Sequence, residues 1–430
     1  MQSKHSAAVL AAISGVPFIM VLGNSMLIPV LPAMKQIMSL SRLEVSMLIT
    51  AFSIPGLLIP VAGFLSDRIG RKKVIIPGLL LYGLGSVIAG AAAIILGANA
   101  YTWLIVGRVI QGIGAAATTP IAMALTGDLF TGPQRSKALG IVEAANGMGK
   151  VLSPVLGAAI GLIAWYAAFI LFPVVVAPIV LGMWLLVREP ENKQKKQSVS
   201  QYARSIKKIF QHKSALLLTS FLGGMIALLI LFGILFFLSD YLETQVGIFG
   251  IVKGLALAAP VLLMSATSLV TGIFLKKQLM LLKWLAVTGL GLIALSLTAL
   301  IFFQNIYFFF AAISITGVGT GLLLPCLNTI ITGSVAAAER GLITAVYGSV
   351  RFLGVAAGPP FFGYLMEQSN TYMYIAGGAL AGITALLTAG LLRVQDMSQP
   401  EQAGQSGQPE PPPVTTEFVF SPSPARKPQS

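Results

Sequence analysis

The sequence predicts an all-α integral membrane protein with twelve transmembrane helices arranged as two pseudo-symmetric six-helix bundles. Its 430 residues are 56% hydrophobic and only 10% charged, and the mean hydropathy is +0.86. Long stretches contain no charged residue at all, and a pattern of Gly, Pro and Arg recurs in the second half. A chain of this composition has too little polar surface to cover a soluble globule. We therefore expect the lipid bilayer to be its solvent.

Charge-free stretches set the predicted spans, since a helix needs about 20 apolar residues to cross the hydrocarbon core. Two examples of sufficient length are Val45 to Ser66 and Val74 to Gly107. No cleavable signal peptide is expected, because the first stretch is itself a full span. Division of the stretches at Gly, Pro and Asn clusters gives twelve predicted spans, at residues 9–31, 44–65, 74–96, 101–126, 136–161, 164–187, 214–239, 246–273, 284–303, 307–333, 341–366 and 371–392.

The net charge of +14 is distributed unevenly between the two predicted faces of the membrane. With the N-terminus inside, 22 of the 28 basic residues fall on one side, and only Lys35 and Arg42 fall on the other. Such a bias is typical of cytoplasmic loops. The sequence thus predicts a multi-pass protein of the cell (plasma) membrane with cytoplasmic N- and C-termini. The basic residues are assigned to membrane topology, so no nucleic acid partner is expected.

An internal repeat with an offset of 205 residues divides the chain. Six positions share this offset, and they pair as Gly112 with Gly317, Gly114 with Gly319, Pro120 with Pro325, Arg135 with Arg340, Gly149 with Gly354, and Pro154 with Pro359. A shared offset predicts two parallel halves. We expect an N-terminal bundle at 1–187, a basic cytoplasmic linker at 188–213, a C-terminal bundle at 214–392, and a disordered Pro-rich cytoplasmic tail at 393–430.

A charged, glycine-flanked turn separates the second and third predicted spans. It reads Gly63, Phe64, Leu65, Ser66, Asp67, Arg68, Ile69, Gly70, Arg71, Lys72, Lys73. Gly63 allows a close helix end, Gly70 allows a positive φ angle, and the four basic residues hold the turn in water. This turn resembles the cytoplasmic signature loop of the major facilitator superfamily.

Two further motifs carry the same resemblance, which covers about 390 residues. The fourth span carries Leu104, Arg108, Gln111, Gly112 and Gly114 at the spacing of the family's second motif. The fifth carries Gly149, Ser153, Pro154, Gly157 and Ala158, which resemble the antiporter motif, except that Ser153 and Ala158 replace the usual glycines.

The resemblance implies roles for some of these residues. Asp67 and Arg71 would hold the halves together on the cytoplasmic side, with Gly63 in the same switch. Arg108 would take part in proton coupling, and the helix bend from Gly149 to Pro154 would take part in export. For the glycines themselves, close helix packing is the alternative, because small residues let membrane helices approach.

Ionisable residues inside spans indicate function by default, because a charge at bilayer depth costs a few kcal/mol. Arg108, Glu143, Lys150 and Arg351 are the ones that matter, whereas Lys253 lies near a span end, where it could pair with Asp240 or Glu243. Helical spacing places Glu143, Asn146, Gly147, Lys150, Pro154 and Gly157 on one face, which we expect to line a central cavity.

Glu143 is the candidate proton carrier, together with Arg108. Burial favours the neutral form of a carboxyl group and a nearby cation favours the charged form, so an alternating cavity could switch between them. A static ion pair of Glu143 with Lys150 or Arg108 is an equally weighted alternative. The excess of interior bases predicts an anionic or weakly acidic amphipathic substrate. Its expected contacts are Asn24, Gln111, Asn146, Lys150, Tyr347 and Arg351, and an aromatic stripe from Phe232 to Tyr241 is a further, weaker candidate.

The sequence therefore predicts a secondary transporter that exchanges protons for small amphipathic molecules and exports them, with a catecholate siderophore as the preferred substrate and drugs such as an acidic antibiotic next. An uptake symporter or facilitator, and a non-transporting membrane sensor, are the alternatives. No catalytic residue, cofactor or metal site is expected, and the proton gradient would be the energy source. The expected partners are the substrate, protons and the lipid bilayer, with the protein as a monomer.

Overall fold

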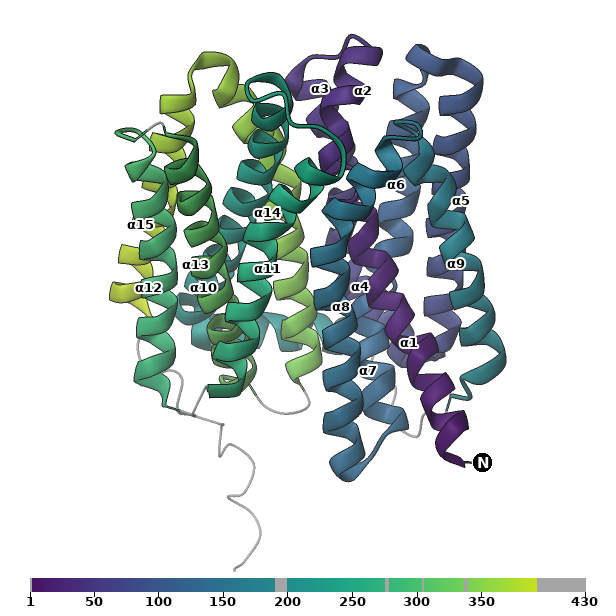
Figure 1. Ribbon diagram of the computed structural model, residues 1–430. Helices are drawn as coiled ribbons and strands as arrows, with labels where there is room; N and C mark the ends of the chain where they lie inside the picture. The colour runs from purple at the N-terminus through teal and green to yellow at the C-terminus, as the bar shows by residue number, and fades with distance from the viewer. Residues whose placement is uncertain (1, 190–198, 275–277, 304, 336–338, 393–430) are drawn as a thin grey trace, which may run out of the picture.

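The computed structural model describes residues 2–189, 199–274, 278–303, 305–335 and 339–392, and every regular element in them is helical. Two groups of helices stand side by side (Figure 1): the purple-to-teal helices α1 to α9 lie on the right, and α10 to α15 lie on the left. The all-α membrane fold predicted from the sequence is confirmed.

The first group, called here the N-half, contains nine α-helices and three short 3₁₀ helices. They are α1 (Gln2–Ser25), η1 (Ile28–Val30), α2 (Leu31–Ile37), α3 (Arg42–Ser53), η2 (Ile54–Leu58), α4 (Ile59–Ile69), α5 (Lys72–Leu96), η3 (Gly97–Asn99), α6 (Tyr101–Ala116), α7 (Thr119–Leu129), α8 (Gly132–Gly161) and α9 (Ala167–Leu186). The second group, the C-half, contains α10 (Val199–Thr244), α11 (Gly250–Phe274), α12 (Leu279–Ala299), α13 (Ile306–Gly333), α14 (Arg340–Gln368) and α15 (Asn370–Leu391).

Eleven stretches of the described residues are long and apolar enough to cross a membrane. The fifth predicted span, α8, is not among them. It is 30 residues long, or about 45 Å at 1.5 Å per residue, but it carries Glu143, Asn146 and Lys150, which lower its hydropathy. With α8 included, the described helices make the twelve predicted crossings.

Three of the spans are broken where prolines interrupt the helix. Pro29 and Pro32 accompany η1 between α1 and α2, and Pro55 and Pro60 accompany η2 between α3 and α4. A proline has no N–H to donate to the preceding turn, so the backbone tightens locally. The fourth span is also interrupted, between α6 and α7, just before Pro120.

Part of the predicted linker is helical. α10 begins at Val199, well before the seventh span, and Lys213 has a non-helical backbone (φ −132°, ψ 31°) where the direction changes. Residues 199–212 therefore form a helix of their own ahead of the span, whereas the sequence analysis assigned them only to a linker. Ile209 is buried and the Phe210 ring packs edge-on against Phe221 of the span, 5.8 Å between centroids.

The glycines of the sequence repeat make equivalent contacts in the two halves. A Cβ at Gly112 would meet the carbonyl of Phe52 in the second span, and one at Gly317 would meet that of Pro260 in the eighth. Gly149 faces the Phe18 carbonyl of the first span in the same way as Gly354 faces that of Met225 in the seventh. The repeat thus marks places where pairs of helix backbones touch.

Candidate functional site

The two ends of the bundle differ. We call the end that holds the N-terminus and the turn between α4 and α5 the Arg71 end, and the end that holds the turn between α2 and α3 the Asp240 end (Figure 1). The halves contact each other where α14 packs on α3, η2 and α4 and where α11 packs on α8. There the Thr50 hydroxyl of α3 donates to the Ala356 carbonyl of α14 at 2.6 Å, and a Cβ at Gly254 of α11 would lie 2.8 Å from the Pro154 carbonyl of α8.

Arg108 of α6 is fully buried inside the N-half. Its Nε donates to the Leu48 carbonyl of α3 at 3.0 Å, and its Nη1 donates to the Gly23 carbonyl of α1 at 2.8 Å. The guanidinium also lies over the ring of Phe52, 4.3 Å from the centroid. Carbonyl oxygens and an aromatic face thus offset its charge, and among the described residues no carboxylate forms an ion pair with it.

Gln111 contacts this arginine, and Asn24 directly follows Gly23 in the chain. The Gln111 side chain accepts from Arg108 at 2.9 Å and donates to the Ser86 hydroxyl. Both Asn24 Oδ1 and Arg108 Nη2 are buried without a hydrogen-bond partner among the described residues. A buried polar atom without a hydrogen-bond partner costs free energy. These two atoms could therefore bind a polar group of another molecule.

The polar face of α8 carries the predicted acid and base. Glu143 is exposed, and its Oε1 accepts from Asn146 Nδ2 at 3.2 Å. Lys150 is partly buried, about two turns beyond Glu143 on the same helix. Neither of the proposed ion pairs of Glu143, with Lys150 or with Arg108, forms between the described residues in this conformation.

Tyr347 and Arg351 are the predicted binding residues of the other half. Arg351 Cζ lies 5.5 Å from the centroid of the Tyr347 ring one turn away on α14. Tyr347 in turn stacks on Phe221 of α10, 5.5 Å between centroids, and is almost completely buried. Tyr347 Oη and Arg351 Nε have no hydrogen-bond partner among the described residues. The structure thus places predicted binding residues on both halves, Lys150 on α8 and Tyr347 and Arg351 on α14.

The small residues of α8 serve packing. A Cβ at Gly149 would lie 3.0 Å from the Phe18 carbonyl of α1, and one at Gly157 would overlap the Met26 carbonyl. Gly157 therefore faces the segment between α1 and η1, not a cavity as its helical spacing suggested, whereas a Cβ at Gly147 would meet nothing within 4 Å. Ser153 stands where the antiporter motif has glycine, and its hydroxyl donates to the Leu22 carbonyl at 3.3 Å.

The signature loop forms a charged cluster within the N-half. Arg71 pairs with Asp67 at 2.9 Å and, through Nε, with Asp128 of α7 at 2.5 Å. Gly70 has a φ of +112°, as expected. Gly63 was expected to allow a close helix end, but it lies inside α4, and a Cβ there would meet no heavy atom of the described residues within 4 Å.

Two acids of this cluster were missed by the sequence analysis. Asp128 follows the fourth span, and Glu189 follows the sixth; the Glu189 carboxylate accepts from the backbone N–H groups of Arg71 and Lys72. Lys72 Nζ also donates to the Trp184 and Val187 carbonyls at 2.7 Å. The local sequence around Asp128 and Glu189 does not indicate that they contact the loop. Their positions directly after predicted spans could have identified them as candidates.

The remaining candidates of the sequence analysis lie outside this site. Lys253 pairs with Glu243, so the expectation of a local partner is confirmed. In the aromatic stripe, Phe236 and Phe237 are buried in the C-half, where Phe237 packs against Phe309 and Tyr374.

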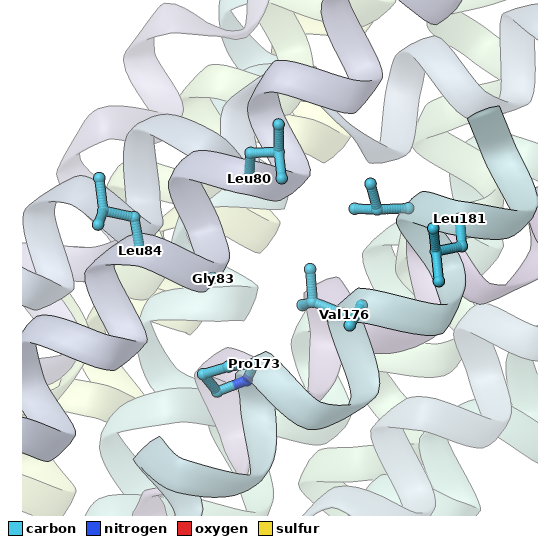
Figure 2. Close-up of a pocket in the computed structure, with 8 residues that line it drawn as sticks. Leu80, Gly83, Leu84, Pro173, Val176 and Leu181 are labelled. Atoms are coloured by element: carbon cyan, nitrogen blue, oxygen red, sulfur yellow. The ribbon is translucent and has the colours of Figure 1, made fainter.

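An apolar pocket of about 390 Å³ lies between α5 and α9. Figure 2 shows Leu80, Gly83 and Leu84 of α5 facing Pro173, Val176 and Leu181 of α9 across it. Leu80, Leu84 and Leu181 are exposed, as expected for side chains that meet lipid. This pocket contains none of the predicted site residues.

Comparisons with known proteins bear on the family. A sequence profile of the Major Facilitator Superfamily matches residues 13–282 and 221–426. The Bacillibactin exporter of Bacillus subtilis is 42% identical over 367 residues, which is 85% of this chain and 91% of that protein. Multidrug resistance protein 1 of the same organism is 26% identical, covering 86% of this chain and 93% of that protein.

Solved structures have the same fold at low sequence identity. The crystal structure of a D-xylose-proton symporter is 14% identical with a TM-score of 0.74, covering 92% of this chain and 100% of the other. A bacterial homologue of the human lysosomal transporter Spinster, in an inward-facing and occupied conformation, is 18% identical with a TM-score of 0.73, covering 92% and 99%.

Proposed function

Because this chain belongs to the major facilitator superfamily, a family of transporters and not of enzymes, we propose that it exports small amphipathic anions in exchange for protons. The relative named as a bacillibactin exporter supports a siderophore as the substrate, with a catecholate siderophore preferred. The multidrug relatives support drugs such as an acidic antibiotic as the next substrate class.

One observation carries the choice of an anion. Lys150 is a partly buried base of the N-half, and Arg351 of the C-half has a buried Nε without a hydrogen-bond partner among the described residues. An anion that reached both cations from a central site would stabilise them. A substrate that contacts both halves also fits a transporter in which the halves move around a central site.

Glu143 is the proposed proton carrier, with Arg108 as its proposed partner in coupling. Glu143 lies on the same helix face as Asn146 and Lys150 and is accessible in this conformation. Lys150 lies about two turns away on the same helix, so loss or gain of the proton would alter the field at the anion site. No cofactor is invoked, since the proton gradient would supply the energy.

The proposed topology places the Arg71 end in the cytoplasm of a cell whose plasma membrane holds the protein, and the protein acts as a monomer. In this orientation the exposed Glu143 faces the compartment from which the substrate is taken. The basic residues of the loops support this orientation.

Deletion of the gene in a siderophore-producing strain tests substrate and direction together. We expect siderophore to accumulate in the cells and its secretion to fall, with recovery when the wild-type gene is returned and no recovery with a Lys150→Gln, Arg351→Gln double variant. Unchanged secretion in the deletion strain would rule out a siderophore as the substrate. The Lys207→Gln variant, which alters an exposed base on the helix before the seventh span, should restore secretion fully.

An uptake symporter is the second candidate, favoured by Ser153 and Ala158 at the two antiporter-motif positions where glycine is usual. It predicts that the deletion strain takes up less substrate from the medium, with no accumulation inside.

A further inference from the structure

Asp240 is a nearly buried acid that joins the two halves. It lies near the end of α10 in the C-half and is 5% exposed. Its Oδ1 lies 3.6 Å from Lys35 Nζ of α2, and its Oδ2 lies 3.3 Å from Arg42 Nη2 of α3. Both cations belong to the N-half, so this carboxylate bridges two of the N-half helices from across the interface.

A second set of contacts lies beside it. Lys253 of α11 pairs with Glu243 at 2.5 Å and also donates to the Pro29 carbonyl of the N-half at 2.8 Å. The Ser239 hydroxyl donates to the Ile28 carbonyl at 2.8 Å. We call Lys35, Arg42, Ser239, Asp240, Glu243 and Lys253 the latch.

The broken helix at η1 makes these carbonyls available. In a continuous α-helix the Ile28 carbonyl would accept from the N–H of residue 32, but that residue is a proline. The carbonyl accepts instead from the Leu31 N–H and from Ser239 of the other half. A backbone group freed by the break thus becomes a docking point for the C-half.

The position of the two acids is unfavourable for α10 alone. Asp240 and Glu243 lie in the last turns of a helix that ends at Thr244, where the helix dipole disfavours negative charge. Their cations must offset this cost. Two of these three cations, Lys35 and Arg42, belong to the N-half. The two acids are therefore fully stabilised only while the halves are in contact at this end.

We propose that Asp240 is the central residue of a latch that keeps the Asp240 end closed, and that the latch must open before substrate can leave there. Separation of the halves removes Lys35 and Arg42 from Asp240 and leaves an acid at the helix end without its cations. The charged cluster at the Arg71 end differs, because Asp67, Arg71 and Asp128 all belong to the N-half. This inference concerns closure and goes beyond the proposed substrate and proton coupling.

Distances between spin labels on the full-length protein in lipid nanodiscs test the proposal. Ile37 and Val246 are exposed residues on opposite halves near the latch. The chain has one cysteine, Cys326, so a Cys326→Ser background with Ile37→Cys and Val246→Cys gives one labelled pair. We expect Asp240→Asn to raise the ratio of open to closed populations at this end by about tenfold or more, because loss of one partner from a buried charge cluster is costly.

Matched variants separate the latch from a general loss of structure. Glu367→Gln removes an exposed acid on the last turn of α14 and should leave the distance unchanged. The Lys35→Gln, Arg42→Gln variant should open the same end, and its combination with Asp240→Asn should add little more, since both remove one interaction. Asp240→Glu should stay mostly closed. An unchanged distance in Asp240→Asn, an equal change in Glu367→Gln, or fully additive effects would overturn the proposal.

Discussion

The guanidinium of Arg108 lies 4.3 Å from the centroid of the Phe52 ring and donates to the carbonyls of Leu48 and Gly23 and to the Gln111 side chain. The arginine therefore ties α6 to α1 and α3. It does so without an ion pair among the described residues, which is an unusual way to hold a charge at this depth. The planar group is suited to the site, because it can stack and donate in two directions at once.

Arg108→Lys should lower transport by about tenfold or more while the protein still inserts and purifies. A lysine keeps the charge but cannot stack on Phe52 and reach both carbonyls. Transport per molecule in proteoliposomes measures the effect. Arg204→Lys, at an exposed arginine on the helix before the seventh span, is the matched control, and an Arg108→Lys protein as active as this control would contradict the assignment.

Gly112→Ala should lower the apparent melting temperature by several degrees, because its Cβ would overlap the Phe52 carbonyl. Gly317→Ala should act similarly through the Pro260 carbonyl at the equivalent place in the C-half. Gly147→Ala, where a Cβ meets nothing within 4 Å, should be neutral or slightly stabilising. Thermal unfolding followed by size-exclusion chromatography gives the comparison, and equal melting temperatures for all three variants would refute the packing interpretation.

Lys150→Gln and Arg351→Gln should each raise the apparent KM for an anionic substrate by about tenfold, as expected for loss of one charged contact. The effect on an uncharged substrate should be small. Transport assays at varied substrate concentration measure it, with Lys207→Gln as the control for loss of one positive charge. If anions and neutral molecules were affected equally, the charge argument would fail.

Asp128→Asn should slow transport several-fold while the free energy of unfolding changes by less than about 1 kcal/mol, because a partly exposed ion pair contributes little stability. Arg71→Gln should slow transport at least as much, because Arg71 also pairs with Asp67. The double variant should be no slower than Arg71→Gln, since that change already removes the contact with Asp128. Additive losses of transport would show that Asp128 and Arg71 act separately.

The fold could be predicted from the sequence because the bilayer imposes a simple rule on span length and polarity. The repeat was also readable, since Gly112 and Gly317 mark equivalent backbone contacts. The span that α8 forms was predicted despite its low hydropathy, because the stretches were divided at Gly, Pro and Asn clusters. The helix formed by residues 199–212 was not predicted, because its basic residues were interpreted only as a linker.

The sequence predicted which types of residue form the site, but not which groups those residues contact. Arg108 and Lys150 drew attention as charges inside spans, but nothing local indicated that Arg108 would be held by carbonyls of α1 and α3. The partners of Arg71 were missed for the same reason: Asp128 and Glu189 are distant in sequence and meet the loop only in the folded N-half. Helical spacing also gave a wrong orientation for Gly157, which faces Met26 and Pro29 and not a cavity.

Proton-driven transport in inverted membrane vesicles is the most direct test of the central claim. Wild type and Glu143→Gln would be compared with a catecholate siderophore, an acidic antibiotic and a lipophilic cation as substrates. We expect gradient-dependent uptake of the two anions by the wild type and its loss in Glu143→Gln, with the cation transported poorly. A preference for the cation, or a Glu143→Gln variant that still uses the gradient, would contradict proton-coupled export of anions through Glu143.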